Sequence, residues 1–155
     1  MPVIALAAGL LATGCAGLDP KEKARQRAVE DVRELAAAAR SEFDSDLRWF
    51  AGKDQSPADM SAEIRRGFEG SPNRSVLDVT VGPDGAARLE LVLFGRGEAG
   101  GGLSYDSAAV RLCVAIAGRV DAGATAETSD LPCPDDAPGP GPGIGTVVET
   151  VQLDD

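Results

Sequence analysis

The residues able to do chemistry in this chain are three cysteines and 25 acidic side chains, because its 155 residues include no histidine. The absence of histidine removes the commonest general base, the Ser-His-Asp and Cys-His triads, and most zinc and copper sites. Acid–base catalysis would need two carboxylates held about 5–10 Å apart across a cleft. Asp44 and Asp46 are two positions apart on a predicted helix and do not face each other. We therefore interpret them as exposed helix charges or as a helix break.

Two features bear on nucleotide and nucleic-acid binding, and both argue against it. Gly95, Gly97 and Gly100 form a Gly-x-Gly-x-x-Gly pattern directly after a predicted strand. A dinucleotide site would need a helix next, with its N-terminus facing the pyrophosphate, but a β-type pattern follows instead. We expect residues 95–102 to form a mobile glycine-rich loop. The formal net charge of −10 excludes the basic face that nucleic-acid binding requires.

Aromatic side chains are scarce, at 4% of the chain. Trp49 and Phe50 end a predicted helix, and Tyr105 follows the glycine-rich segment. The three could together line a pocket, but aromatic side chains bury large areas and this chain has few of them. We expect them to pack in the core between helix and sheet.

An apolar run without charge occupies residues 2–11, and the chain then continues Leu-Ala-Thr-Gly-Cys, ending at Cys15. Residues 1–14 are too few to span a bilayer as a helix, which needs about 20 residues, but they suit the apolar core of a signal peptide. Small residues before a cysteine fit a narrow peptidase cleft, and the thiol can then take up a diacylglyceryl group. The pattern resembles the lipobox of bacterial lipoproteins, over residues 1–15 only.

The resemblance implies that residues 1–14 are removed and that Cys15 becomes the first residue of a lipidated chain. Acyl chains such as palmitate would then anchor the protein to the extracytoplasmic face of the cell membrane without spanning it. Four basic residues that closely follow the anchor could contact anionic lipid head groups. They are Lys21, Lys23, Arg25 and Arg27. A solvated helix face is the equally weighted alternative.

The remaining cysteines, Cys113 and Cys133, form an even pair once Cys15 carries lipid. Outside the cytoplasm a disulfide can form and persist, so we predict a bridge between them in preference to two unrelated buried thiols. Closing such a loop would stabilise the fold by ~3 kcal/mol.

Two helices are predicted in the first half of the chain. Asp19-Pro20 is a strong helix start, and apolar residues then recur every three or four positions. They are Ala28, Val32, Leu35, Ala39, Phe43, Leu47 and Phe50. Ser56-Pro57 starts a second, shorter helix, which we expect to end at Gly67 or Gly70.

The period then changes to two, which is typical of strands. Residues 77–81 and 89–93 alternate between apolar and polar side chains on either side of a Gly-Pro-Asp-Gly turn, and this predicts a β-hairpin. Residues 110–117 predict a third strand with Cys113 on the face opposite its apolar side chains. Residues 124–131 predict a weaker fourth strand.

These elements predict one α+β domain over residues 15–155, with a long and a short helix packed on an antiparallel sheet of three to five strands. The helices fall within 19–70 and the β-rich part within 75–133. A loop rich in proline and glycine follows at 134–145, and 146–155 form a strand or a free tail. A sheet curved around the long helix, as in cystatin-like folds, is one arrangement that this order allows.

The sequence singles out no catalytic residue, cofactor or metal site. We therefore expect a non-catalytic lipoprotein that binds or tethers an envelope protein. The alternatives are a small envelope enzyme that uses Asp or Glu chemistry, and a structural oligomer formed through the apolar stripe of the long helix.

Overall fold

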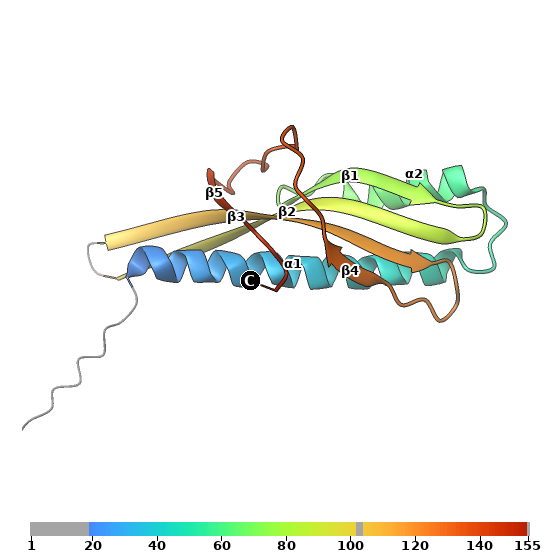
Figure 1. Ribbon diagram of the computed structural model, residues 1–155, viewed down its shortest axis with the longest axis horizontal. Helices are drawn as coiled ribbons and strands as arrows, with labels where there is room; N and C mark the ends of the chain where they lie inside the picture. Colours follow the sequence, from blue (N-terminus) through green and yellow to red (C-terminus); the bar gives the residue numbers. More distant parts are fainter. Residues whose placement is uncertain (1–18, 102–103, 155) are drawn as a thin grey trace, which may run out of the picture.

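The computed structural model of the protein describes residues 19–101 and 104–154. The chain forms two helices and then five strands, which confirms the predicted α+β class (Figure 1). The elements are α1 (Pro20–Phe50), α2 (Pro57–Phe68), β1 (Arg74–Val81), β2 (Ala86–Gly101), β3 (Ser104–Arg119), β4 (Glu127–Asp130) and β5 (Val147–Val151). The proposed signal peptide, 1–14, and Cys15 lie outside the described residues.

Helix α1 is a single rod of 31 residues, about 45 Å long at 1.5 Å per residue. Asp19 caps its start by accepting a hydrogen bond from the Lys21 backbone N–H. The helix does not break at 44–46, and the Ser45 hydroxyl donates to the Ser41 carbonyl one turn earlier. Asp44 is buried and accepts a hydrogen bond from the Ala126 backbone N–H.

The buried stripe of α1 is close to the predicted one, with one exchange. Leu35 is only partly buried, and Ala36 takes the place on the core-facing side that we expected for Leu35. Helix α2 begins as predicted, with Ser56 accepting a hydrogen bond from the Asp59 backbone N–H at 3.2 Å. Its buried side chains join the same hydrophobic core as the stripe of α1. They are Met60, Ile64 and Phe68.

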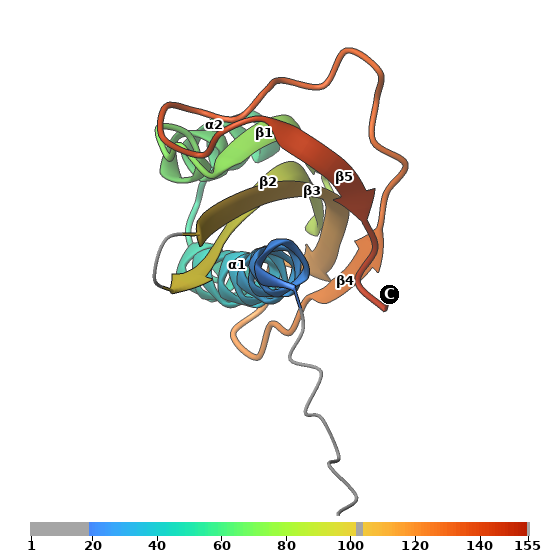
Figure 2. The same cartoon turned by 90° about the vertical axis from the view of Figure 1, so that its left-hand side faces the viewer.

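The sheet is built on a long antiparallel hairpin of β2 and β3 and curves around α1 (Figure 2). Strand β1 pairs antiparallel with β2, and β4 pairs antiparallel with β3. Strand β5 lies along the same edge of β3 as β4 but runs parallel to β3. Of the two outcomes expected for the last ten residues, the chain therefore forms a strand.

The prediction of a mobile glycine-rich loop was wrong for residues 95–101, which continue strand β2 to its end. The glycines are needed because β2 crosses α1 at backbone distance. A Cβ on Gly95 would lie 2.7 Å from the Cβ of Val32, and one on Gly97 would overlap the backbone of Ala24 and Ala28. The Gly-x-Gly-x-x-Gly pattern thus serves helix–strand packing.

Strand β1 also departs from simple alternation. The sequence puts Leu77 on the same face as Val79 and Val81, but an irregularity between Val76 and Asp78 shifts the register. Val76 therefore packs with the core on the α1 side, whereas Leu77 packs on the opposite face of the sheet. One extra residue in a strand reverses the faces of those before it.

The face of the sheet opposite α1 is partly covered by residues 131–146, which we call the strap. The strap leaves the sheet edge after β4 and crosses the face. At Pro72 it is fixed by a backbone hydrogen bond of 2.9 Å from Gly141. It then returns to the edge as β5. Beneath the strap lies a small apolar cluster formed by Val92, Phe94 and Cys113. Beyond the strap, Thr80, Arg88 and Ala117 remain exposed on this face.

Candidate functional site

The four basic residues predicted to contact lipid all lie in the first turns of α1, but two of them bind within the protein. Arg25 forms a two-pronged ion pair with Glu149 of β5, with one hydrogen bond of 2.6 Å. This hydrogen bond lowers the pKa of Glu149 below its ordinary value. Arg27 donates to the backbone carbonyl of Glu98 in β2. Lys21 and Lys23 are exposed, so they are the members of the set best placed for a head-group contact.

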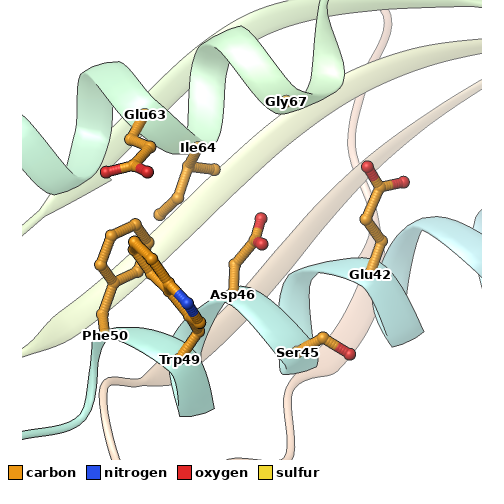
Figure 3. A pocket seen from close by; sticks show the side chains of 8 residues that line it. All are labelled: Glu42, Ser45, Asp46, Trp49, Phe50, Glu63, Ile64 and Gly67. Atoms are coloured by element: carbon orange, nitrogen blue, oxygen red, sulfur yellow. The ribbon is translucent and has the colours of Figure 1, made fainter.

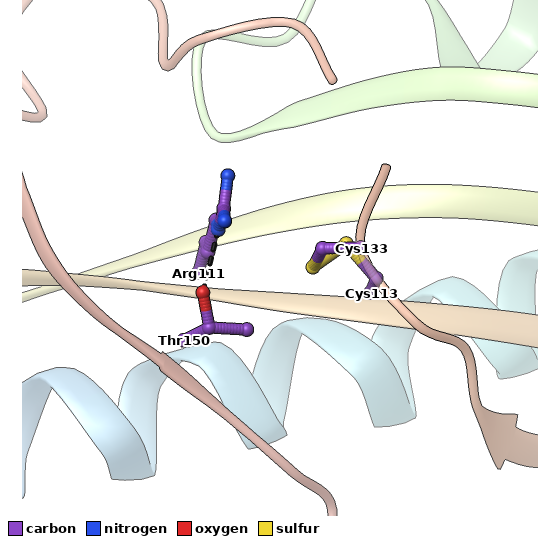
Figure 4. Close-up of a disulfide and its surroundings, with 4 residues drawn as sticks. All are labelled: Arg111, Cys113, Cys133 and Thr150. Carbon is purple, nitrogen blue, oxygen red and sulfur yellow. Dashed lines mark hydrogen bonds between the residues drawn. A yellow bond between two sulfur atoms is a disulfide. The ribbon is translucent and has the colours of Figure 1, made fainter. Parts of the chain in front are cut away.

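The predicted pairing of Cys113 with Cys133 is confirmed: the two cysteines are joined, with Cα atoms 5.3 Å apart (Figure 4). Cys113 projects from β3 on the face away from α1, as its position in the strand predicts, and Cys133 lies in the strap. Farther along β3, Arg111 donates a hydrogen bond of 2.6 Å to Thr150 of β5. These contacts fasten the strap at its start and β5 at its return, and we interpret the disulfide as structural.

The three aromatic residues do not form one cluster, because Tyr105 lies apart from Trp49 and Phe50. Phe50 is 2% exposed and packs in the core as predicted, but Trp49 is 51% exposed and Tyr105 is 65% exposed. Tyr105 lies near the tip of the β2–β3 hairpin, beside the start of α1, whereas Trp49 lies at the other end of that helix (Figure 1). The core prediction was therefore wrong for Trp49 and Tyr105. Because neighbouring helix positions differ by about 100°, the same turn that buries Phe50 leaves Trp49 outside.

Trp49 instead borders a groove between the C-terminal half of α1 and helix α2 (Figure 3). The groove has a volume of about 390 Å³. Its lining residues come from both helices and are Glu42, Ser45, Asp46, Trp49, Phe50, Glu63, Ile64 and Gly67. Gly67 leaves the α2 side of the groove open. A Cβ added there would project into free space, with no atom within 4 Å.

One part of the groove is apolar and aromatic. Phe50 and Ile64 are buried at its base, and the ring of Trp49 lies edge to face with Phe50 at 4.9 Å between centroids. The ammonium of Lys53, in the turn after α1, lies over the Trp49 ring. The indole therefore already holds a cation on one face.

Three carboxylates, Glu42, Asp46 and Glu63, form the other part. Glu42 pairs with Arg74 at 2.6 Å, and Glu63 accepts a hydrogen bond of 3.4 Å from the Gln55 amide. The pKa of Asp46 is raised to about 6, chiefly by partial burial and also by the charges of Glu42 and Glu63, while Arg74 counteracts them in part. A carboxyl that titrates near neutral pH in a groove marks a candidate functional group.

From the sequence we considered Asp46 only beside Asp44 and interpreted both as exposed helix charges or a helix break. That interpretation was wrong, because the helix is continuous, Asp44 is buried and Asp46 is partly buried. Asp44 faces the opposite side of α1 and accepts a hydrogen bond from the loop before β4. Asp46 shares the groove with Glu42, one helical turn away. The signal was present in the sequence as two acidic residues at i and i+4, a spacing that disfavours an isolated helix. Glu63 could not be found in this way because it comes from the second helix.

The groove offers carboxylate oxygens beside an aromatic face, an arrangement suited to holding a cation. Within 19–101 and 104–154, no group of three or more acidic or cysteine side chains has the arrangement of a metal site. Neither helix in that part of the chain is both long and apolar enough to cross a membrane. Comparisons with family models, curated proteins and solved structures found no match to this chain.

Proposed function

We propose that the protein is a membrane-anchored lipoprotein of the cell envelope that acts as a non-catalytic binding module. The groove between α1 and α2 is its binding site. The observation that carries this proposal is the groove itself, at the C-terminal end of α1, which combines a half-exposed tryptophan with two carboxylates, Asp46 and Glu63, that form no ion pair among the described residues.

The length of α1 supports this arrangement. The helix begins five residues after Cys15, and Asp46 lies 26 positions beyond Pro20, or about 40 Å along the axis. The sheet packs along this length, so α1 acts as a stiff spacer (Figure 1). An anchor at one end would hold the groove well clear of the membrane surface.

The cysteine pair supports an extracytoplasmic location. A disulfide between β3 and the strap is stable where the environment is oxidising, and such bonds are rare in the cytosol. Together with the lipobox pattern ending at Cys15, it favours the envelope over the cytoplasm.

The anchor is tested by the intact mass of the protein from native membranes, measured before and after reduction. We expect the loss of residues 1–14 and a lipid-sized increment on Cys15. Reduction should add about 2 Da, the two hydrogens of an opened disulfide. An unprocessed chain with free thiols would remove both the location and the tethering role.

The groove is tested by photocrosslinking in native membranes. A photoreactive residue at the position of Trp49 should capture a discrete protein, whereas the same residue at exposed Glu127 in β4 should not. The captured protein should then bind the purified lipoprotein directly. Equal labelling from both positions, or none from either, would contradict a binding role for the groove.

One observation favours a small envelope enzyme as the second candidate function. A carboxyl with its pKa raised to about 6 beside other carboxylates is the pattern of an acid and base pair. This candidate predicts hydrolysis of envelope glycans, with activity lost in both Asp46→Asn and Glu63→Gln. Turnover that survives both substitutions would reject it.

The third candidate is an oligomer formed through the apolar stripe of α1, and that stripe is not exposed. The apolar stripe that would pair with another copy is buried against the sheet of the same chain.

A further inference from the structure

We infer that the groove between α1 and α2 binds a positively charged segment of a protein partner and seats a lysine side chain beside Trp49, Asp46 and Glu63. This inference rests on the proposed function and names the partner's chemistry.

The charge balance of the groove requires a cation. Of the three carboxylates, Glu42 pairs with Arg74, which also donates to the carbonyls of Phe68 and Gly67. Asp46 and Glu63 have no lysine or arginine within ion-pair distance among the described residues. An occupant that supplies an ammonium would relieve the repulsion between these two carboxylates.

The aromatic side of the groove points to the same chemistry independently of the acids. Trp49 is the only tryptophan of the chain. Half of its surface is exposed, whereas the next residue, Phe50, is buried. Its ring already holds the Lys53 ammonium, a cation supplied by the chain itself.

The shape of the groove fits a lysine better than a bare ion. A lysine carries a four-carbon stem that packs on apolar surface while its ammonium reaches polar groups. Phe50 and Ile64 offer that apolar surface beneath, and Asp46 and Glu63 offer the acceptors (Figure 3). At about 390 Å³ the groove lies near the lower end of the usual range for ligand sites, about 300–1,000 Å³. The net charge of −10 would steer a basic segment towards the protein.

Lys53 then acts as an internal competitor, since its ammonium holds the Trp49 ring in the absence of a partner. Replacing it should free the ring and raise affinity for a basic peptide. The matched control is Lys23, an exposed lysine in the first turn of α1, at the far end of the molecule. Lys53→Gln and Lys23→Gln change the net charge equally, so a difference between them isolates the competition at Trp49.

The experiment uses the purified full chain in detergent and follows the fluorescence of Trp49, which reports on the groove without a label. The probes are a tetralysine peptide, the same peptide with every lysine acetylated, and spermidine. We expect saturable binding of tetralysine, at least tenfold weaker binding of the acetylated peptide, and weaker binding of spermidine. Asp46→Asn and Glu63→Gln should each weaken tetralysine binding at least fivefold, and Lys53→Gln should strengthen it two- to fivefold.

Two controls separate this effect from general electrostatics and from misfolding. Asp135→Asn, on the exposed strap, should leave affinity unchanged, as should Lys23→Gln. Each variant should keep the circular dichroism spectrum of the parent. Equal binding of the acetylated peptide, tighter binding of spermidine, or unchanged affinity in both groove variants would overturn the inference.

The pH dependence gives a further readout. Asp46 is faced by Glu42 on its own helix, Glu63 on α2 and Arg74 on β1, and its pKa is raised to about 6. Affinity for tetralysine should therefore fall as the pH is lowered from 7 to 5, and the fall should be smaller in Asp46→Asn. If crosslinking at Trp49 captures a partner that binds without lysine, this inference fails while the binding function stands. Absence of any groove-specific partner would reject the function itself.

Discussion

The two ends of α1 face their neighbours in opposite ways. At the N-terminal end, Ala24 and Ala28 lie directly against Gly95 and Gly97 of β2, and no side chain separates helix from strand. At the C-terminal end, larger side chains hold α1 and α2 apart around an open groove. We call the N-terminal end of α1 the sealed end and its C-terminal end the open end. The two ends differ in the size of the side chains that face the neighbouring element.

The contrast shows where the chain gives up stability. At the sealed end, small residues bring the backbones of α1 and β2 into direct contact. At the open end, the chain keeps a half-buried carboxyl with a raised pKa, which costs folding free energy, and an exposed tryptophan, which forgoes part of the gain from burial. Features that cost stability and persist in one place are typical of functional sites.

The largest effect is expected at the sealed end, from Gly97→Ala. The new methyl group would overlap the α1 backbone at Ala24 and Ala28, which cannot move aside as a flexible side chain would. We expect the free energy of unfolding to fall by about 3 kcal/mol, at the upper end of typical overpacking costs. Chemical denaturation measures this, with Gly139→Ala on the strap, where a Cβ meets nothing within 4 Å, as the matched control. Equal midpoints for the two variants would mean that β2 and α1 are not in backbone contact.

At the open end, Asp46→Asn should raise stability. The folded-state pKa of Asp46, about 6, lies above its ordinary value of 3.8. The folded protein therefore binds more protons than the unfolded chain between about pH 4 and 6, and the free energy of unfolding falls as the pH rises through that window. The substitution should remove this penalty and stabilise the protein by ~1 kcal/mol at pH 7, a figure reduced for solvent screening.

The pH profile makes this prediction specific to Asp46. The gain from Asp46→Asn should approach its full size above pH 6, shrink as the pH falls, and vanish near pH 3, where the wild-type carboxyl is protonated in both states. Denaturation curves at pH 3, 4, 5, 6 and 7 test this. A gain that does not change with pH would show that the carboxyl is not destabilised by its surroundings.

Asp44, two positions away on the same helix, should respond with the opposite sign. Its buried carboxylate accepts the Ala126 backbone N–H, and a hydrogen bond to a charged group is worth more than one to a neutral amide. We expect Asp44→Asn to lower the free energy of unfolding by about 1 kcal/mol at pH 7. Thermal melts of the two variants, run in parallel, measure this contrast. Melting temperatures that shift in the same direction would contradict the prediction.

These residues also show how far the sequence could be interpreted. Helix starts at Asp19 and Ser56, the apolar stripe of α1 and the placement of Cys113 all follow from local rules of capping and periodicity. Such rules act between residues a few positions apart, so they were sufficient for the fold class and for the first two elements.

The sealed and open ends could not be predicted because each depends on contacts between distant segments. Gly95 and Gly97 look like loop residues until α1 is known to lie against them. Asp44 and Asp46 look equivalent until β4 and α2 take opposite sides of the helix. The groove exists only where Glu63 and Gly67 of α2 meet the last turns of α1, a pairing that no local pattern specifies.

The smallest expected effect concerns Gly67, which keeps the groove open without being required by the fold. Its backbone is not in the left-handed region, and an added Cβ would meet nothing within 4 Å. Alanine is favoured over glycine by about 1 kcal/mol inside helices, and Gly67 lies next to the last residue of α2, so we expect Gly67→Ala to stabilise the protein by ~0.5 kcal/mol. The same methyl group would narrow the groove and weaken tetralysine binding without affecting packing at Gly97. A gain in stability together with a loss of binding, measured by denaturation and by Trp49 fluorescence, would show that this glycine is kept for the groove. A loss of stability would instead show that the fold requires Gly67, as it requires Gly97 at the sealed end.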